Sequence, residues 1–270
     1  MRKNRPLTGK FILVTRPAEQ AGELAALITG AGGRPVLFPA IEVRDLEDMR
    51  PFFTLVDRLE DFDFAIFISP NAVGRAMKRM LERRALPAGL KIIAVGGGTA
   101  RALANCGVSD VIAPRQRYDS EALLDLPELT TPGGRRVVIF RGQGGRELLG
   151  DALNARGARV EYAECYRRCR PEIDPAPVLD AWRRGELDAV TVTSSEGLRN
   201  LYEMLGNPGR DLLVRTPLFV PHPRIAEAAR ELQVHSVVVT GPHDTGLLTG
   251  MTAYFSARAR RGQPGLSNRD

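Results

Sequence analysis

The chain has 270 residues, of which 43% are hydrophobic and 26% charged, as in a globular protein of one large or two ordinary domains. No apolar run approaches the ~20 residues of a membrane helix. The run Phe11–Val14, behind a basic N-terminus, is too short for a signal-peptide core, so we expect a cytoplasmic protein. The net charge of +6 suits an anionic partner, either a nucleic acid or a polycarboxylate ligand.

Short runs typical of strands alternate along the chain with stretches that carry apolar residues at helical spacing. Several of these runs are continuously apolar, as expected for strands covered by helices on both faces. The alternation predicts an α/β protein built of parallel sheets. The predicted strands are 11–15, 35–38, 64–68, 91–95, 111–113, 136–140, 159–162, 189–193, 217–220 and 236–239.

Cysteine and histidine are scarce. The three cysteines are Cys106, Cys165 and Cys169, and an odd number without an export signal favours reduced thiols. The three histidines all follow residue 220, so we expect no metal site.

The sequence contains a long internal duplication. Three pairs of matching positions are each 125 residues apart: Arg16 with Arg141, Gly32 with Gly157, and Ser69 with Ser194. Each pair occupies the same place in a similar strand and helix pattern. The repeat is far longer than a solenoid unit, which predicts two similar α/β halves.

Two similar domains joined by hinges would form a cleft, where small-molecule sites usually lie. The candidate hinges are Pro39–Arg44 and Ala163–Pro171, because each follows the second strand of its repeat.

The residues after the predicted strands are suited to binding anions. In parallel sheets, ligands bind beyond the carboxyl ends of the strands, where free backbone N–H groups of the next helix attract carboxylates and phosphates. Small residues, hydroxyls and arginines occur at five such ends: 15–17, 69–71, 96–99, 141–145 and 194–196. A purely structural alternative is that Ser69 and Ser194 only cap helices.

Several familiar motifs are missing. Gly96-Gly97-Gly98 lacks the spacing of a dinucleotide fingerprint, and the glycines after Arg141 are not followed by the Lys-Ser/Thr of a P-loop. No Gly-x-Ser-x-Gly elbow or Cys-x-x-Cys pair occurs. We therefore expect neither a nucleotide nor a metal cofactor.

Taken together, these motifs resemble the uroporphyrinogen-III synthase family. The resemblance covers roughly residues 10–250, in family order. Its pieces are Val14-Thr15-Arg16-Pro17, Ile68-Ser69-Pro70-Asn71-Ala72-Val73, Val95-Gly96 through Thr99-Ala100, Phe140-Arg141-Gly142, Cys165-Tyr166-Arg167-Arg168 and Asp188 through Leu198.

The resemblance implies two flavodoxin-like parallel-sheet domains, joined by a two-segment hinge around an interdomain cleft. It also implies that the first βαβ piece of each repeat docks onto the remainder of the other repeat. Domain one would then comprise 1–39 and 172–270, and domain two 45–162.

The implied activity belongs to porphyrin and heme biosynthesis. Hydroxymethylbilane, a linear tetrapyrrole with eight carboxylates, would lose its hydroxyl as water and close through a spiro intermediate that inverts ring D. The enzyme would be a cytoplasmic monomer without a cofactor. Its task would be to hold one folded conformer, and positioning of this kind contributes roughly 7–11 kcal/mol to a barrier.

The resemblance also assigns roles to individual residues. Tyr166, in the second hinge and facing the cleft, would be the acid for hydroxyl departure; the alternative is a tyrosine packed against a domain. Arg16 and Arg141 would bind propionates, the alternative being an interdomain salt bridge. The remaining substrate-binding candidates are Ser69, Asn71, Gly96, Thr99, Gly142, Ser194, Ser195 and His222.

His222 is included because the sequence departs from the family here. Many members have glycine and threonine after the strand 217–220, whereas this chain has Pro221-His222-Pro223-Arg224. Prolines lack an N–H group, so this strand end must bind the substrate differently.

Two other functions remain open at the level of sequence. A non-catalytic relative could bind a tetrapyrrole or another polyanion without converting it. A nucleic-acid binder would also suit the positive charge, but no helix-turn-helix pattern occurs and only 6% of residues are aromatic. We therefore expect a small-molecule substrate and neither nucleic acid nor a membrane as partner.

Overall fold

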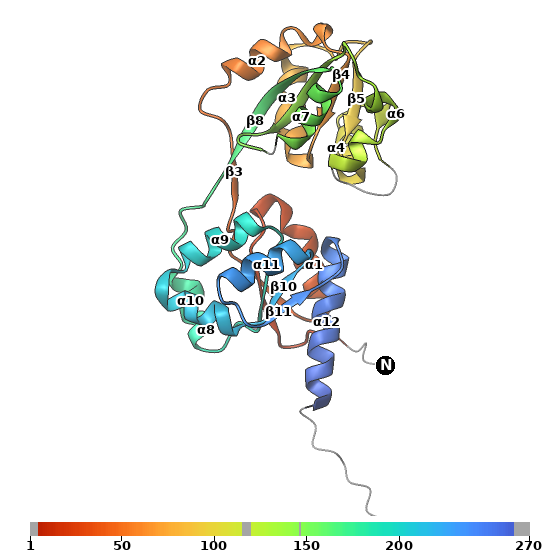
Figure 1. Ribbon diagram of the computed structural model, residues 1–270. Coiled ribbons are helices and arrows are strands. Elements are labelled where there is room, and N and C mark those ends of the chain that lie inside the picture. The colour runs from red at the N-terminus through yellow and green to blue at the C-terminus, as the bar shows by residue number, and fades with distance from the viewer. Residues whose placement is uncertain (1–4, 115–119, 146, 262–270) are drawn as a thin grey trace, which may run out of the picture. The chain divides into compact units, whose positions relative to one another are not determined.

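The computed structural model describes residues 5–114, 120–145 and 147–261. The chain divides into two compact units, one made of residues 1–42 and 169–270 and the other of residues 43–168. In each unit, helices cover both faces of a sheet (Figure 1). The predicted domain limits, residues 1–39 with 172–270 for domain one and residues 45–162 for domain two, stay predictions.

The sheet of the first unit has the strand order β11, β10, β9, β1, β2, and its strand pairs are parallel. Numbered along the unit, this is the flavodoxin-like order 2-1-3-4-5. The strands are β1 (Phe11–Val14), β2 (Arg34–Leu37), β9 (Ala189–Thr191), β10 (Leu218–Val220) and β11 (Val237–Val239).

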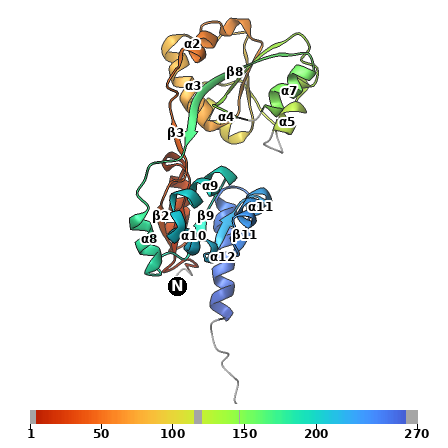
Figure 2. The ribbon, with the colours of Figure 1, turned by 60° about the vertical axis from the view of Figure 1, so that its left-hand side comes forward.

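Helices pack on both faces of this sheet because successive side chains of a strand point to opposite sides. Ile12 and Val14 pack in one cluster with α1 and α12, whereas Leu13 packs in another with the remaining helices. The helices are η1 (Ala18–Gln20), α1 (Gly22–Gly30), α8 (Ala176–Arg183), α9 (Ser195–Met204), α10 (Gly206–Arg215), α11 (Pro223–Glu231) and α12 (His243–Arg261). Figure 2 shows the α8, α9 and α10 side of this unit.

The second unit repeats the pattern in the strand order β3, β8, β7, β4, β5, β6. Without the edge strand β3, and counting β7 and β8 as the first two strands, this is again the order 2-1-3-4-5. The strands are β3 (Glu42–Arg44), β4 (Phe64–Phe67), β5 (Lys91–Ala94), β6 (Val111–Ile112), β7 (Arg136–Gly142) and β8 (Arg159–Cys169).

The core of the second unit also has two sides. Phe67 and Phe140 stack at 4.6 Å between ring centroids on the side covered by α2, α3 and α4. Ile66 and Ile139 face the side covered by α5, α6 and α7. The helices are α2 (Arg50–Val56), η2 (Leu59–Asp61), α3 (Pro70–Arg83), α4 (Gly97–Asn105), α5 (Ser120–Leu124), α6 (Pro127–Thr130) and α7 (Leu148–Ala155).

The two repeats exchange their first strands. β1 and β2 of the first repeat join β9, β10 and β11 of the second, while β7 and β8 of the second repeat join β4, β5 and β6 of the first. Each sheet is therefore completed by strands from the other repeat.

Two equivalent aspartates fasten these exchanged strands. Asp188 accepts a hydrogen bond from the backbone N–H of Phe11 at 2.9 Å and pairs with Lys10 at 2.7 Å. Asp63, its counterpart in the first repeat, accepts from the N–H of Arg136 at 2.9 Å and pairs with Arg135 at 2.6 Å. In each case the aspartate precedes one strand and binds the start of its neighbour.

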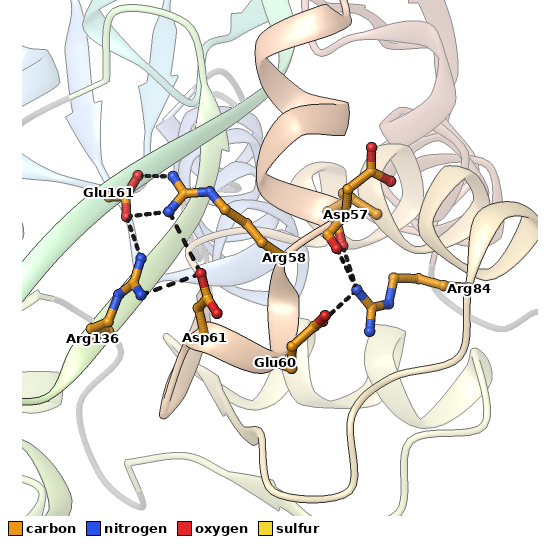
Figure 3. A network of polar contacts seen from close by, with 8 residues as sticks. Asp57, Arg58, Glu60, Asp61, Arg84, Arg136 and Glu161 are labelled. Atoms are coloured by element: carbon orange, nitrogen blue, oxygen red, sulfur yellow. Dashed lines mark hydrogen bonds and ion pairs between the residues drawn. The ribbon is translucent and has the colours of Figure 1, made fainter.

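An ionic network ties the segment after α2 to β7 and β8 (Figure 3). Glu161 on β8 pairs with Arg58, and lies 3.4 Å from Arg136. Arg136 also contacts Asp61 at 3.2 Å. These side chains are about one-third exposed, so the network contributes modestly to stability and is screened by salt.

The prediction of an α/β fold with parallel sheets is confirmed, and the hinge segments 39–44 and 163–171 stay predictions, although the strand limits near them differ from those expected. Residues 42–44 form β3, and β8 continues through residue 169 instead of ending at 162. The two strands are neighbours in the sheet (Figure 2). Regular strand pairing therefore extends into both of these segments.

Candidate active site

Tyr166, in the segment predicted as the second hinge, lies on β8 of the second unit, and its side chain is fully buried. Its hydroxyl is 3.2 Å from Oγ of Ser69. Ser69 caps α3, accepting a hydrogen bond from the backbone N–H of Ala72 at 3.0 Å. The phenol therefore belongs to a polar chain that ends at the positive start of a helix.

Gly142 makes room for the tyrosine ring. It lies opposite Tyr166 on β7, next to a bulge in the strand pairing. A Cβ at Gly142 would lie only 2.6 Å from Cε2 of Tyr166 and 2.7 Å from its Cζ. These distances are well below van der Waals contact, so any larger residue would displace the ring.

Arg141, the residue before Gly142, is enclosed within its own unit, with 5% of its surface exposed. Its guanidinium lies 3.7 Å from the ring centroid of Tyr162, donates to the carbonyl of Gly145 at 3.1 Å and lies 3.4 Å from Glu164. Burial raises the pKa of Tyr162, with Arg141 opposing the shift. The planar side chain of Arg141 is thus oriented by stacking as well as by charge.

A pocket of about 620 Å³ opens beside Arg141. The aromatic rings of Phe52 and Tyr162 line this pocket. Arg167 and Glu47, which form an ion pair at 3.1 Å, line it as well. The sequence did not single out Tyr162, Glu164 or Arg167 as site residues, although all three are on β8 near Tyr166.

A second helix start lies beside the first in this unit. Gly96 precedes α4 and is buried, and Thr99, in the first turn, is 2% exposed. A Cβ on Gly98 would lie 3.9 Å from Cγ of Pro70, the first residue of α3, so the two helix starts are neighbours. Asn71, half-buried, follows Pro70. The adjacent N-termini are suited to carboxylate groups.

Arg16 follows β1 at the carboxyl edge of the other sheet. It forms an ion pair with Asp244 of α12 at 2.5 Å, and Asp244 is only 4% exposed. Burial raises the pKa of Asp244, and Glu23 adds to the shift while Arg16 and His243 oppose it. The printed ion pairs of Arg16, with Asp244, and of Arg141, with Glu164, each lie within one unit.

The neighbouring strands of this sheet carry the other candidates. Ser194 caps α9 after β9, accepting from the N–H of Gly197 at 2.9 Å, so the capping role holds for both repeat-equivalent serines. His222 caps α11 after β10; it is exposed, and its Nδ1 accepts from the N–H of Arg224 at 3.1 Å.

Some buried polar atoms at these strand ends have no hydrogen-bond partner among the described residues. They include Nε of Arg16, Oγ of Ser195 and both carboxylate oxygens of Asp244, of which Oδ1 is in the ion pair with Nη1 of Arg16. A buried polar atom without a partner is costly, so each one calls for an explanation, such as a bound ligand, ion or water, or a catalytic role. The atoms belong to residues at the edge where parallel sheets bind ligands.

The predicted residues fall into two groups. Seven of them lie on or after adjacent strands of the second unit: Ser69, Asn71, Gly96, Thr99, Arg141, Gly142 and Tyr166. Four, Arg16, Ser194, Ser195 and His222, follow adjacent strands of the first.

The described part of the chain offers no clustered metal ligands. Within it, no group of three or more His, Cys, Asp or Glu residues could hold a metal ion. Over the same residues, no helix has the length and apolar character needed to cross a membrane. Cys165 is buried, which raises the pKa of its thiol to about 12, and it contacts the carbonyl of Arg141 at 3.2 Å.

Comparison with known proteins identifies the family. A family model described as uroporphyrinogen-III synthase HemD matches residues 22–249. The uroporphyrinogen-III synthase of Escherichia coli (strain K12) is 35% identical over 239 residues, covering 88% of this chain and 97% of the relative. That of Salmonella typhimurium (strain LT2) is 36% identical over 242 residues, with the same coverage. The chain belongs to the uroporphyrinogen-III synthase family.

Solved structures support the fold. A uroporphyrinogen III synthase mutant from the extremely thermophilic bacterium Thermus thermophilus matches with a TM-score of 0.60 at 22% identity, over 94% of this chain and 100% of that one. The uroporphyrinogen-III synthetase from Helicobacter pylori 26695 matches with a TM-score of 0.57 at 13% identity, over 91% and 99%.

Membership of the uroporphyrinogen-III synthase family confirms the predicted family, its enzyme class, a lyase, and its place in porphyrin biosynthesis. The family acts on a small-molecule tetrapyrrole. The roles of the individual residues are not tested by these likenesses and remain predictions.

Proposed function

We propose that this chain converts hydroxymethylbilane to uroporphyrinogen III, with loss of water and inversion of ring D through a spiro intermediate. The observation that carries the proposal is the family match, which extends over nearly the full length of curated synthases. The reaction is redox-neutral, since the only other product is water, so the proposal requires no cofactor.

The substrate chemistry matches the strand ends of both units. Eight carboxylates need many donors, and helix N-termini with nearby arginines provide charge-assisted hydrogen bonds for them. We assign carboxylate binding to Arg16 and Arg141, to the helix starts at Ser69–Asn71 and Gly96–Thr99, and to Ser194, Ser195 and His222. Several moderate contacts would select one folded conformer of the bilane, which is the main requirement for inversion.

Tyr166 is the proposed hydrogen-bond donor to the departing hydroxyl. A phenol carries an O–H that can donate a hydrogen bond to the leaving oxygen, and pass on its proton, as the C–O bond breaks. Ser69 and Gly142 fix the ring from two sides, by the 3.2 Å hydroxyl contact and by close packing. Because the side chain is buried, the hydroxyl reaches the substrate only if local movement exposes it.

The finer assignments form part of the same proposal. We propose that the enzyme works as a cytoplasmic monomer on its small-molecule substrate, without nucleic acid or membrane.

The test is an isomer assay. Hydroxymethylbilane is generated enzymatically in the presence of the purified chain, and the oxidised products are separated by chromatography. We expect the type III isomer in excess. Production of the uninverted isomer alone, at the rate without protein, would refute the synthase activity and favour a non-catalytic binder.

A further inference from the structure

Asp244 is a buried acid that the residue assignments above do not use. It lies in the first turn of α12, and an aspartate there normally accepts backbone N–H groups of its own helix. Among the described residues, however, neither of its carboxylate oxygens has a hydrogen-bond partner. The contact that the structure gives this carboxylate is the ion pair with Arg16, at 2.5 Å.

Helix stability alone does not account for this arrangement. A carboxylate whose residue is only 4% exposed loses its hydration, and a single ion pair offsets that loss only in part, so buried pairs contribute little net stability. Burial accordingly raises the pKa of Asp244 despite the nearby guanidinium. A costly group whose ionic partner is a site residue is better explained by what it does to that partner.

The support behind Asp244 is rigid. Leu247 and Met251 of α12 are fully buried in the same cluster as Leu24 and Ile28 of α1. The first turn is pressed against the preceding chain, since a Cβ on Gly246 would lie 2.2 Å from the carbonyl oxygen of Gly241. The carboxylate is therefore held in place by packing on both sides.

Arg16 is fixed at its other end by the sheet. The residue before it, Thr15, donates a side-chain hydrogen bond to the carbonyl of Thr191 on β9 at 2.8 Å. The guanidinium has five N–H donors, and its Nε has no hydrogen-bond partner among the described residues. About a quarter of the side chain, 23%, stays exposed. The ion pair uses one nitrogen and leaves other donors for a ligand.

We propose that Asp244 is a positioning residue, which aims the Arg16 guanidinium at a carboxylate of the substrate. The proposal rests on the proposed function, because it takes Arg16 as a carboxylate-binding group. Asp244 itself does not contact the substrate. Its negative charge fixes the orientation of the Arg16 guanidinium, and a guanidinium that is already oriented loses less side-chain entropy when it binds the substrate.

The experiment compares Asp244→Asn, Arg16→Gln and the double variant in the hydroxymethylbilane isomer assay. Asp188→Asn is the matched control, because it breaks the Lys10 ion pair of the same unit, at the start of β1, away from the carboxyl edge. Thermal melting followed by circular dichroism checks that each variant is folded.

We expect Asp244→Asn to raise KM about tenfold with kcat within about twofold, since an interaction made equally in ground and transition states changes KM. In the Arg16→Gln background the same change should have almost no further effect on KM. Asp188→Asn should lower the melting temperature and leave KM unchanged. If Asp244→Asn alone does not fold, Asp244→Ser takes its place, because a serine can still cap the helix and leaves no buried charge; it should also raise KM when Arg16 is present, and a folded Asp244→Ser enzyme with wild-type KM would overturn the proposal.

Two results would overturn the proposal while leaving the synthase function intact. One is a folded Asp244→Asn enzyme with wild-type KM; the other is an equal rise in KM in both Arg16 backgrounds. If the wild-type chain makes only the uninverted isomer at the uncatalysed rate, the proposed function fails, and the role of Asp244 fails with it.

Discussion

Gly142→Ala should impair the enzyme by displacing one hydroxyl group. The new methyl would lie 2.6 Å from Cε2 of Tyr166, about 1 Å closer than an ordinary carbon–carbon contact. The ring is fully buried, so it can give way only by displacing the side chains packed around it. A shift of that size would break the 3.2 Å contact with Ser69 and move the hydroxyl off its target.

Two magnitudes follow from this geometry. Overpacking of a core costs about 1–3 kcal/mol, which lowers the melting temperature by roughly 2–4 °C for each kcal/mol in a chain of this size. A misplacement of about 1 Å costs on the order of 100-fold in rate, so we expect kcat to fall about 100-fold. Tyr166→Phe should lower kcat similarly without unfolding the protein, because the ring remains.

The decisive measurement is a double-mutant cycle in the isomer assay. If Gly142 acts through the hydroxyl, Gly142→Ala should lower kcat strongly in the wild type but hardly at all in Tyr166→Phe. Its cost in stability should be equal in both backgrounds, since the ring clash persists. Gly74→Ala is the control: it adds a methyl to α3 with nothing within 4 Å and should raise stability without changing kcat.

An equal loss of kcat in both backgrounds would mean that the substitution disturbs the sheet in general. Wild-type turnover in Gly142→Ala would show that the position of the ring does not matter, and unchanged turnover in Tyr166→Phe would remove this residue from the mechanism.

Three further predictions concern stability. Ser194→Ala removes the cap of α9 and should cost about 1 kcal/mol in denaturant unfolding; an unchanged midpoint would show that the cap is dispensable. Glu161→Gln breaks the bridge between Arg58 and Arg136 and should cost at most about 1 kcal/mol, less at 1 M salt; a loss that is independent of salt would contradict an ionic origin. Hydrogen bonding and nearby arginines lower the pKa of Asp63, so its contribution to stability is present above about pH 4 and is lost on acidification. The free energy of unfolding of Asp63→Asn should be lower than that of the wild type by roughly 1–2 kcal/mol at pH 7, and this difference should disappear below about pH 4. A difference that stays constant from pH 7 to about pH 3 would disprove the linkage.

The repeating pattern of the fold was visible in the sequence because it depends on local signals. All ten predicted strands occur in the structure within a few residues of their expected limits, except for the late end of β8, and the apolar runs were correctly interpreted as strands covered on both faces. β3 was missed because Glu42-Val43-Arg44 is too short to show alternation. Its partner, the distant β8, stabilises it in the sheet.

The end of β8 was predicted too early for a different reason. Ala163-Glu164-Cys165 does alternate between buried and partly exposed side chains, as a strand should. The expectation of a hinge outweighed this local pattern. The same expectation placed Tyr166 on an accessible segment, whereas the structure buries it.

The candidate site was predictable where one residue reveals its own role. Ser69 and Ser194 precede helices, and the structure makes both of them caps. Partners supplied by tertiary contacts were invisible. Asp244 reads as an ordinary acidic residue at a helix start, and no spacing rule connects it with Arg16 at the other end of the chain. Glu164 is likewise undistinguished until β8 pairs with β7.

The exchanged strands make either repeat incomplete by itself. A fragment with only the first repeat would contain β1 and β2 of one sheet and β4, β5 and β6 of the other. Neither set of strands could complete its sheet, because the missing strands belong to the second repeat. Two copies of such a fragment could complete both sheets only by trading strands, as in a domain-swapped dimer. The present chain corresponds to such a dimer with both repeats joined in one polypeptide. Because the two repeats can differ in sequence, the carboxyl edge of each sheet can carry different side chains.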